Sequence, residues 1–181
     1  MAIKKITRSI KPRNDLTAEF VRSILVYNST DGIFTWKARS DTKDRAAKAW
    51  NGKPAGGKSN NKYISIKING VLYKAHRLAW LYMTGEWPKY EIDHINGEPG
   101  DNRINNLREA KRTENSYNRG AQKDNTSGHK GVSFYKPYKK WRATIAADGK
   151  WRHLGYFESI EDAKAAYAKA SSYLHKDFRK I

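Results

Sequence analysis

Between residues 91 and 118 the chain gathers the side chains best suited to do chemistry. Asp93 and His94 are adjacent on a short apolar run that includes Ile92 and Ile95. A carboxylate can hold a hard divalent ion such as Mg²⁺, and an imidazole can take a proton from water near neutral pH. Hydrolysis of a phosphodiester needs an activated water and neutralisation of the phosphate charge. The pair is therefore a candidate hydrolytic site.

Three local patterns would position this pair. The apolar run predicts a strand end, and a turn-rich loop of Gly, Pro, Asn and Asp follows it. A helical pattern then starts at Leu107, with Ala110 and Glu114 on the same side. Asn115 and Asn118 lie one turn apart on an adjoining side. Neighbours on a regular strand point to opposite faces, so the pair can share one cleft only if the strand ends or twists there.

Three short sequences in this stretch resemble the motif of HNH endonucleases, in the form found in phage homing endonucleases. They read Asp-His-Ile-x-Gly from residue 93, Asn-Arg-x-x-Asn-Leu-Arg from residue 102, and Glu-Asn-x-x-Asn-Arg from residue 114. The resemblance implies a ββα-metal fold for this part of the chain.

The resemblance also implies residue roles. His94 would be the general base, and Asp93 the metal-binding carboxylate beside it. Asn106 would hold the loop and orient the base, and Asn115 would be a metal ligand on the helix. Many relatives have His at this third position, so the motif here is the H-N-N variant, with Asn118 as the alternative ligand. One divalent ion, Mg²⁺ or Mn²⁺, is expected, because a two-metal site would usually need several carboxylates and only Asp93 is well placed.

Each of these residues also has an ordinary explanation. An Asp-His pair is often only a polar pair, Asn106 could cap the following helix, and Asn115 and Asn118 could form a solvated face. Their joint occurrence at these spacings in a basic chain favours the nuclease interpretation.

The composition points to a polyanionic partner. The 181 residues include 36 Lys and Arg against 18 Asp and Glu, a formal net charge of +18. Nucleic acid is a better match than a membrane surface, since no apolar run approaches transmembrane length and no signal peptide opens the chain. A cytoplasmic location is expected, in the host cell if the protein is phage-encoded. The absence of cysteine excludes disulfides and Cys-based zinc.

Residues 1–13 form a basic arm, interpreted either as a solvated tail or as a contact to DNA phosphate. Residues 14–120 are expected to form the nuclease domain. Its local patterns first predict a helix capped by Asn14 or Asp15, a strand at 33–36 and a loop at 37–61. A hairpin that turns at Asn69-Gly70 is expected next. A helix at 76–83 follows and ends before Gly85, with these residues expected in the core: Leu78, Trp80, Leu81 and Met83.

The polar, turn-rich segment 121–129 predicts a linker. Beyond it, three short strands and a helix started by Ser159 are predicted over residues 130–181. This part resembles the AP2 DNA-binding domain, through Gly131-Val132, Lys140-Trp141-Arg142-Ala143, Leu154-Gly155-Tyr156-Phe157 and an Ala-rich helix.

Domains of the AP2 type lay their sheet in the major groove. By strand alternation Trp141, Ala143 and Ile145 should face the helix. By position, the resemblance implies a DNA-facing set of Lys130, Lys140, Arg142, Thr144, Trp151 and His153. Basic residues near the motif could clamp phosphates close to the cut: Arg108, Lys111, Arg112 and Arg119. The alternative is that Trp151 belongs to the core and Arg142 is a solvated charge.

Together these patterns predict an α+β protein: a ββα-metal HNH unit followed by a small three-stranded sheet with one helix. The expected function is metal-dependent cleavage of double-stranded DNA by a homing or nicking endonuclease, acting as a monomer with no protein partner. The competing hypothesis is a DNA-binding regulator on a catalytically inactive HNH scaffold. An RNA-binding protein is the third and weaker interpretation.

Overall fold

The computed structural model describes residues 14–37, 50–58, 62–122, 124–175 and 178. The predicted basic arm and parts of the predicted loop at 37–61 lie outside these residues. By its contacts the chain divides into two compact units, Met1–Trp87 and Pro88–Ile181. The motif stretch therefore groups with the C-terminal sheet. The linker predicted at 121–129 falls inside the second unit. That residues 130–181 fold independently of the nuclease domain stays a prediction.

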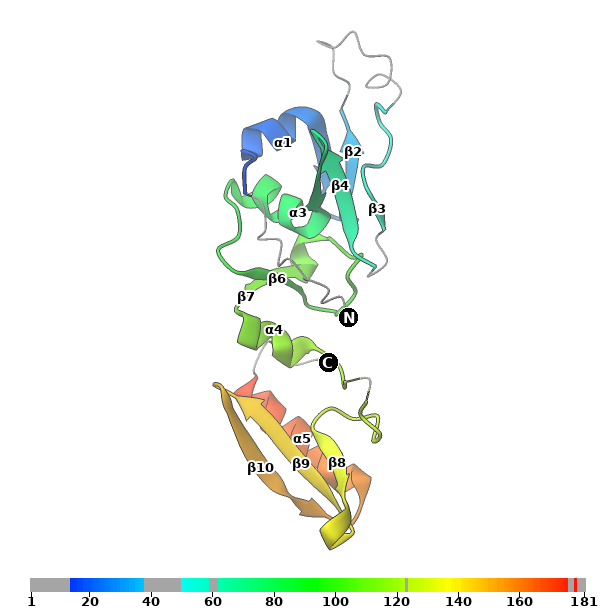
Figure 1. The fold of residues 1–181 in the computed structure, drawn as a ribbon. Helices are drawn as coiled ribbons and strands as arrows, with labels where there is room; N and C mark the ends of the chain where they lie inside the picture. Colours follow the sequence, from blue (N-terminus) through cyan, green and yellow to red (C-terminus); the bar gives the residue numbers. More distant parts are fainter. Residues whose placement is uncertain (1–13, 38–49, 59–61, 123, 176–177, 179–181) are drawn as a thin grey trace, which may run out of the picture. The chain divides into compact units, whose positions relative to one another are not determined.

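The first unit begins with helix α1 (Ala18–Ile24). Thr17 caps this helix, and its side chain accepts a hydrogen bond from the backbone of Phe20. The expected caps, Asn14 and Asp15, lie too early in the chain to reach the first turn. Strands β1 (Leu25–Asn28) and β2 (Ile33–Trp36) follow as an antiparallel hairpin (Figure 1).

The described part of this unit also contains a three-stranded antiparallel sheet and a helix. The strands are β3 (Gly57–Lys58), β4 (Ile64–Ile68) and β5 (Val71–Lys74), and the helix is α3 (Ala75–Thr84). The turn between β4 and β5 is the predicted one: Asn69 and Gly70 have φ of 49° and 82°, as a type I′ turn requires. The buried core includes Leu25, Phe34, Ile66, Leu78 and Leu81.

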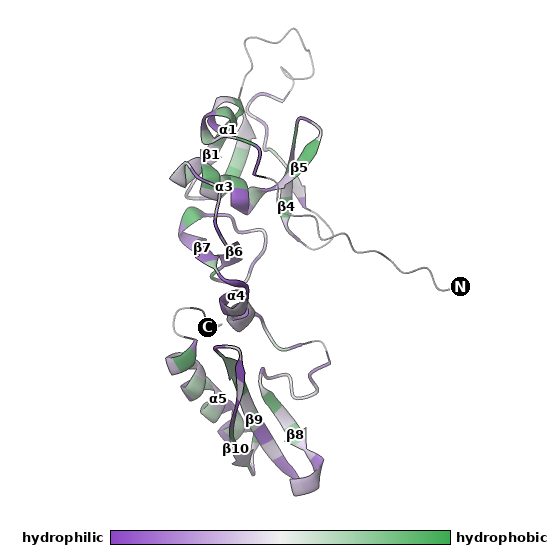
Figure 2. Cartoon of the chain, turned by 60° about the vertical axis from the view of Figure 1, so that its left-hand side comes forward, coloured by the Kyte–Doolittle hydropathy of each residue, from purple (hydrophilic) through white to green (hydrophobic). Residues whose placement is uncertain are grey.

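Two residues of α3 depart from the predicted core. Met83 is 46% exposed, because it lies about 140° around the helix from the buried Leu78. Trp80 is only partly buried. In contrast to the apolar α3, the motif helix of the second unit is largely hydrophilic (Figure 2).

The motif stretch of the second unit has the strand–strand–helix order that the resemblance implies. Strands β6 (Glu91–His94) and β7 (Leu107–Ala110) pair antiparallel, and the loop between them contains one 3-10 turn, η1 (Ile104–Asn106). Helix α4 (Arg112–Asn118) follows.

The prediction of a helix from Leu107 was wrong for its first turn. Residues 107–110 are extended because they pair with β6, which buries Leu107 and Ala110. The helix begins only after Lys111, whose backbone N–H donates to the Glu114 carboxylate at 2.7 Å.

The C-terminal part is a three-stranded antiparallel sheet with one helix against it (Figure 1). The strands are β8 (Val132–Tyr135), β9 (Lys140–Ala147) and β10 (Lys150–Phe157), and the helix is α5 (Ile160–Leu174), capped by Ser159 as predicted. A short 3-10 turn, η2 (Lys136–Tyr138), joins β8 to β9. The buried core between sheet and helix consists of Val132, Ala143 and Ala163, with Trp141, Leu154, Phe157, Ile160 and Tyr167 packed against it.

Gly131 leads into β8 and is required there for two reasons. Its φ is +71°, and a Cβ would lie 2.3 Å from the Tyr167 ring and 2.4 Å from the Thr144 carbonyl oxygen. Close packing around this ring also raises the pKa of Tyr167 to about 12, through burial. The glycine thus lets the sheet and α5 approach one another.

Candidate active site

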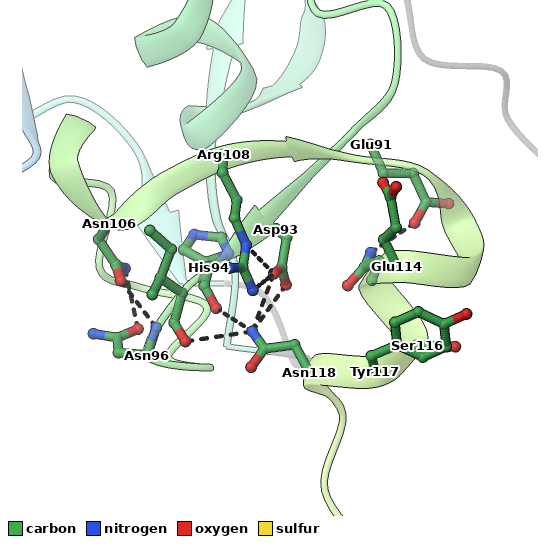
Figure 3. Close-up of polar contacts among 12 residues, drawn as sticks. Glu91, Asp93, His94, Asn96, Asn106, Arg108, Glu114, Ser116, Tyr117 and Asn118 are labelled. Carbon is green, nitrogen blue, oxygen red and sulfur yellow. Dashed lines mark hydrogen bonds and ion pairs between the residues drawn. The ribbon is translucent and has the colours of Figure 1, made fainter. Parts of the chain in front are cut away.

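Asp93 and His94 are both buried, at 6% and 5% exposure, although they are neighbours on β6 (Figure 3). The strand ends at His94, and the chain turns at once, with Gly97 N–H donating to the His94 carbonyl at 2.8 Å. Neighbours on a regular strand would point to opposite faces, but because β6 ends at His94, both side chains can be buried together.

A loop asparagine holds the imidazole ring. His94 Nε2 lies 3.2 Å from Asn102 Oδ1, and Asn102 is only 1% exposed. An amide oxygen can only accept, so Nε2 carries the proton. Burial lowers the pKa of His94 below its ordinary value, an effect partly opposed by the Asn102 hydrogen bond and by the charges of Asp93 and Asp101. Sequence reasoning included Asn102 in a motif segment but gave it no role, because the resemblance assigns the orientation of the base to Asn106.

Asn106 closes the loop. Its Oδ1 accepts from the Asn96 backbone at 3.0 Å, and its Nδ2 donates to Asn96 Oδ1 at 3.0 Å and to the Asp101 carbonyl at 2.8 Å. A second clamp joins Asp101 to Arg103, whose hydrogen bonds lower the pKa of Asp101 to about 2. Asn106 thus makes the loop contacts that the resemblance implies, whereas the contact to the His94 ring comes from Asn102.

Arg108 lies opposite Asp93 in the β6–β7 register and pairs with it. The guanidinium donates to Asp93 Oδ2 from Nε at 2.9 Å and from Nη2 at 2.7 Å. The two side chains are 16% and 7% exposed, so this ion pair is shielded from water. Arg108 was expected to clamp phosphate; in the structure it holds the carboxylate.

Asn118, at the end of α4, is the second group on Asp93 (Figure 3). Its Nδ2 lies 3.1 Å from each carboxylate oxygen and donates to the His94 carbonyl at 2.7 Å. Its Oδ1 is buried and has no hydrogen-bond partner among the residues that the structure describes. Asn115 instead donates to Glu91 at 2.6 Å. The structure therefore brings Asn118, rather than Asn115, to Asp93.

The donor set is compatible with one hard cation. A half-turn of the Asn118 amide about its last torsion would exchange its N and O atoms and place Oδ1 beside the Asp93 carboxylate. Two oxygens in contact need a cation between them, and Mg²⁺ accepts one or two such ligands while keeping several waters. No group of three or more His, Cys, Asp or Glu suited to a metal occurs within the described ranges. One carboxylate and one amide oxygen fit a divalent ion that keeps several waters.

The other basic residues of the predicted phosphate clamp have different surroundings. Lys111, Arg112 and Arg119 are exposed at the two ends of α4. Lys130, expected to face DNA, directs its ammonium into the end of α4 instead. It donates to the carbonyls of Ser116, Tyr117 and Arg119 at 2.8, 2.8 and 2.7 Å.

The sheet face away from α5 carries the rest of the predicted DNA-facing set. Arg142 and Thr144 share this face of β9, while the alternating Ala143 and Ile145 are fully buried, as predicted. Trp151 is 77% exposed, so it does not belong to the core. Lys140, at the end of β9, forms an exposed ion pair with Glu158 at 2.7 Å.

A group of tyrosines on this face was missed. Tyr135, Tyr138 and Tyr156 lie with ring centroids 4.8 to 5.2 Å apart, and His153 lies 4.6 Å from Tyr156. The Arg142 guanidinium lies 5.3 Å from the Tyr135 ring. A β-bulge between His153 and Gly155 changes the alternation along β10, and simple alternation from His153 would have placed Tyr156 elsewhere.

In the described part of the chain, no helix combines the length and apolar character needed to cross a bilayer. The ββα arrangement, with its buried Asp-His pair and closed loop, is that of an HNH nuclease domain, and a family model described as "HNH endonuclease" matches residues 73–117. The chain is also 38% identical over 113 residues to "Protein 3.8" of Escherichia phage T7, an alignment that covers 60% of this chain and 93% of that protein. The chain therefore belongs to the family of this phage protein and carries an HNH endonuclease domain. No solved structure matches it.

Proposed function

We propose that this protein is a metal-dependent DNA endonuclease that hydrolyses phosphodiester bonds in double-stranded DNA. The observation that carries the proposal is the buried pair of Asp93 and His94, with the unsatisfied amide oxygen of Asn118 beside the carboxylate. A chain of net charge +18 suits a polyanionic substrate.

His94 is the general base in this proposal. Because Nε2 donates to Asn102, the lone pair of the neutral ring lies on Nδ1, which would accept a proton from the attacking water. Burial lowers the pKa of His94, so the ring is neutral at physiological pH and competent to take that proton. Asn106 keeps the loop closed, and the loop in turn delivers Asn102 to the ring.

Asp93 and Asn118 are the proposed metal ligands. The family motif by itself implies Asn115 in the place of Asn118. One Mg²⁺ or Mn²⁺ ion held there would neutralise charge on the scissile phosphate and stabilise the leaving oxygen. Arg108 orients Asp93 through two hydrogen bonds to Oδ2, and the Asn118 amide contacts both carboxylate oxygens.

The C-terminal sheet is the proposed DNA reader, of the AP2-like kind. Arg142, Thr144, Trp151 and His153 would contact duplex DNA, joined by the tyrosine group of the same face. Lys111, Arg112 and Arg119 would contact phosphates near the cut. A nuclease unit joined to a separate reader is consistent with a homing or nicking enzyme. We expect it to act as a monomer, and, given its phage relative, in the host cytoplasm.

A DNA-binding regulator on an inactive scaffold is the second candidate. It is favoured by the ion pair between Arg108 and Asp93, which already neutralises the carboxylate that a metal would need.

A plasmid-nicking assay tests the proposed function. With Mg²⁺ or Mn²⁺ the wild type should convert supercoiled plasmid to nicked or linear forms, and EDTA should stop it. His94→Ala should lower the single-turnover rate by about 10²- to 10⁴-fold. His129→Ala is the matched control, because it leaves in place the hydrogen bonds between the His129 backbone and Ser127. If the wild type cuts with neither ion, or if His94→Ala cuts at the wild-type rate, the second candidate or a different base is favoured.

A further inference from the structure

Two aromatic residues of the segment that follows α5 lie against the motif: Phe178 stacks on Arg108, and His175 stacks on Tyr117, the residue before Asn118. We propose that these aromatic residues, His175 and Phe178, position the Asp93 carboxylate for metal binding, so that the nuclease site is completed by residues beyond the reader sheet. This inference rests on the nuclease function proposed above and adds two positioning residues far from the motif in sequence.

The first contact runs through Arg108. The Phe178 ring lies over the guanidinium, with 4.1 Å between Arg108 Cζ and the ring centroid. A guanidinium stacks on an aromatic face while its edge donates hydrogen bonds in its own plane. The edge of this guanidinium donates twice to Asp93 Oδ2. The Phe178 ring therefore fixes the plane in which the Arg108 guanidinium donates its hydrogen bonds to the carboxylate.

The second contact runs through Tyr117, the residue before Asn118 in α4 (Figure 3). The Tyr117 ring is stacked on the His175 ring, with centroids 4.0 Å apart and planes 6° apart. The Tyr117 hydroxyl also accepts from the Asp148 backbone at 3.0 Å. Helix α4 is thereby docked on residues of the C-terminal part, directly beside the asparagine that touches Asp93.

His175 is itself held firmly. It is 3% exposed, its Nε2 donates to the Ala146 carbonyl at 2.8 Å, and its Nδ1 lies 3.2 Å from Ser171 Oγ. The three hydrogen bonds from the Lys130 ammonium tie the end of α4 to the start of the C-terminal part. These contacts hold the His175 ring in its position against Tyr117.

The two contacts converge on one carboxylate. Arg108 and Asn118 both reach Asp93 from within the motif. Arg108 is stacked on Phe178, and Asn118 follows Tyr117, which is stacked on His175. Without the rings, a long arginine side chain and the last turn of a seven-residue helix would hold the carboxylate in several orientations. Groups that orient a metal ligand typically change metal affinity by about 10- to 100-fold when they are lost.

Phe178→Leu tests the first contact. We expect the Mg²⁺ concentration for half-maximal cleavage to rise by about tenfold, with the rate at saturating Mg²⁺ and the affinity for duplex DNA nearly unchanged. Phe178→Tyr keeps an aromatic ring, so its half-maximal Mg²⁺ concentration should be close to that of the wild type. Arg108→Lys loses the planar stack and the paired donors, so it should raise the Mg²⁺ requirement even with Phe178 present. Tyr173→Leu is the matched control, since Tyr173 is 72% exposed on α5.

Two readouts do not depend on cleavage. In the metal-free protein the Arg108 Nε–H NMR signal should be shifted by the ring current of Phe178, and the shift should disappear in Phe178→Leu. Mn²⁺ should broaden the Asn118 side-chain amide signals, and Phe178→Leu should require about tenfold more Mn²⁺ for the same broadening. Tyr117→Leu, compared with Tyr117→Phe, gives the same test for the His175 stack.

The two ideas fail in different ways. If Phe178→Leu and Tyr117→Leu bind Mn²⁺ as tightly as the wild type, the positioning role is overturned, whether or not the protein cuts DNA. If the wild type cuts nothing while these variants bind Mn²⁺ more weakly, the positioning role stands and the nuclease function is wrong. A lowered metal requirement in Phe178→Leu would also overturn the proposal, because it would mean that Arg108 competes with the ion.

Discussion

Replacement of Asn118 by alanine should damage the site far more than replacement of Asn115. Asn118→Ala removes the donor that lies 3.1 Å from both Asp93 oxygens and 2.7 Å from the His94 carbonyl. Asn115→Ala removes one bond, to the exposed Glu91. The two residues lie one turn apart on the same helix, so they form a matched pair of the same chemistry.

The expected loss can be worked from these contacts. A hydrogen bond to a charged group is worth about 1.5–3 kcal/mol, and Asn118 is 5% exposed, so water does not replace it readily. Arg108 remains on Oδ2, which limits the loss to about 2–3 kcal/mol. In a unit of this size that is a fall in Tm of about 10 °C or more. For Asn115→Ala we expect less than about 1 kcal/mol.

Thermal unfolding followed by tryptophan fluorescence measures the loss of stability. The Mg²⁺ dependence of plasmid nicking measures the loss of metal affinity. Asn118→Ala should raise the half-maximal Mg²⁺ concentration by about tenfold, equivalent to 1.4 kcal/mol. Asn118→Asp should be destabilised without metal by its charge beside Asp93, and Mn²⁺ should raise its Tm more than that of the wild type. The reasoning is refuted if Asn115→Ala gives the larger change in both Tm and metal requirement.

Three further predictions concern the base, the sheet and the reader face. The acid limb of the single-turnover cleavage rate should have its midpoint below pH 6.5, because burial lowers the pKa of His94 and only the neutral ring accepts a proton; a midpoint above 6.5 would contradict this. Gly131→Ala should destabilise the protein by about 2–4 kcal/mol in urea unfolding, from overpacking and positive φ. Gly149→Ala, with φ of +73° and nothing near its Cβ, should cost only about 1–2 kcal/mol, and equal losses would show that packing at 131 is unimportant. Arg142→Ala with Trp151→Ala should weaken duplex binding in a gel shift by about tenfold or more while weak, salt-sensitive cutting remains; unchanged binding would assign the reader to another surface.

Local chemistry was readable in the sequence. Asn69-Gly70 specified a hairpin because both residues tolerate positive φ, and Ser159 specified the start of α5 because its hydroxyl satisfies a free backbone N–H. The sequences around Asp93, His94 and Asn106 resemble the HNH motif, and the HNH endonuclease family model matches residues 73–117.

Which side chains meet at Asp93 was decided only by the tertiary structure. Residues 107–110 have a helical pattern, but pairing with β6 makes them a strand and so places Arg108 opposite Asp93. Helix α4 begins only after this strand, and within it Asn118 rather than Asn115 contacts the carboxylate. Sequence spacing records distance along the chain, whereas these contacts depend on the register between strands and on the rotation of a helix about its axis. Asn115 and Asn118 lie only about 60° apart around α4 and about 4.5 Å apart along its axis, so only the folded chain determines which amide meets the acid.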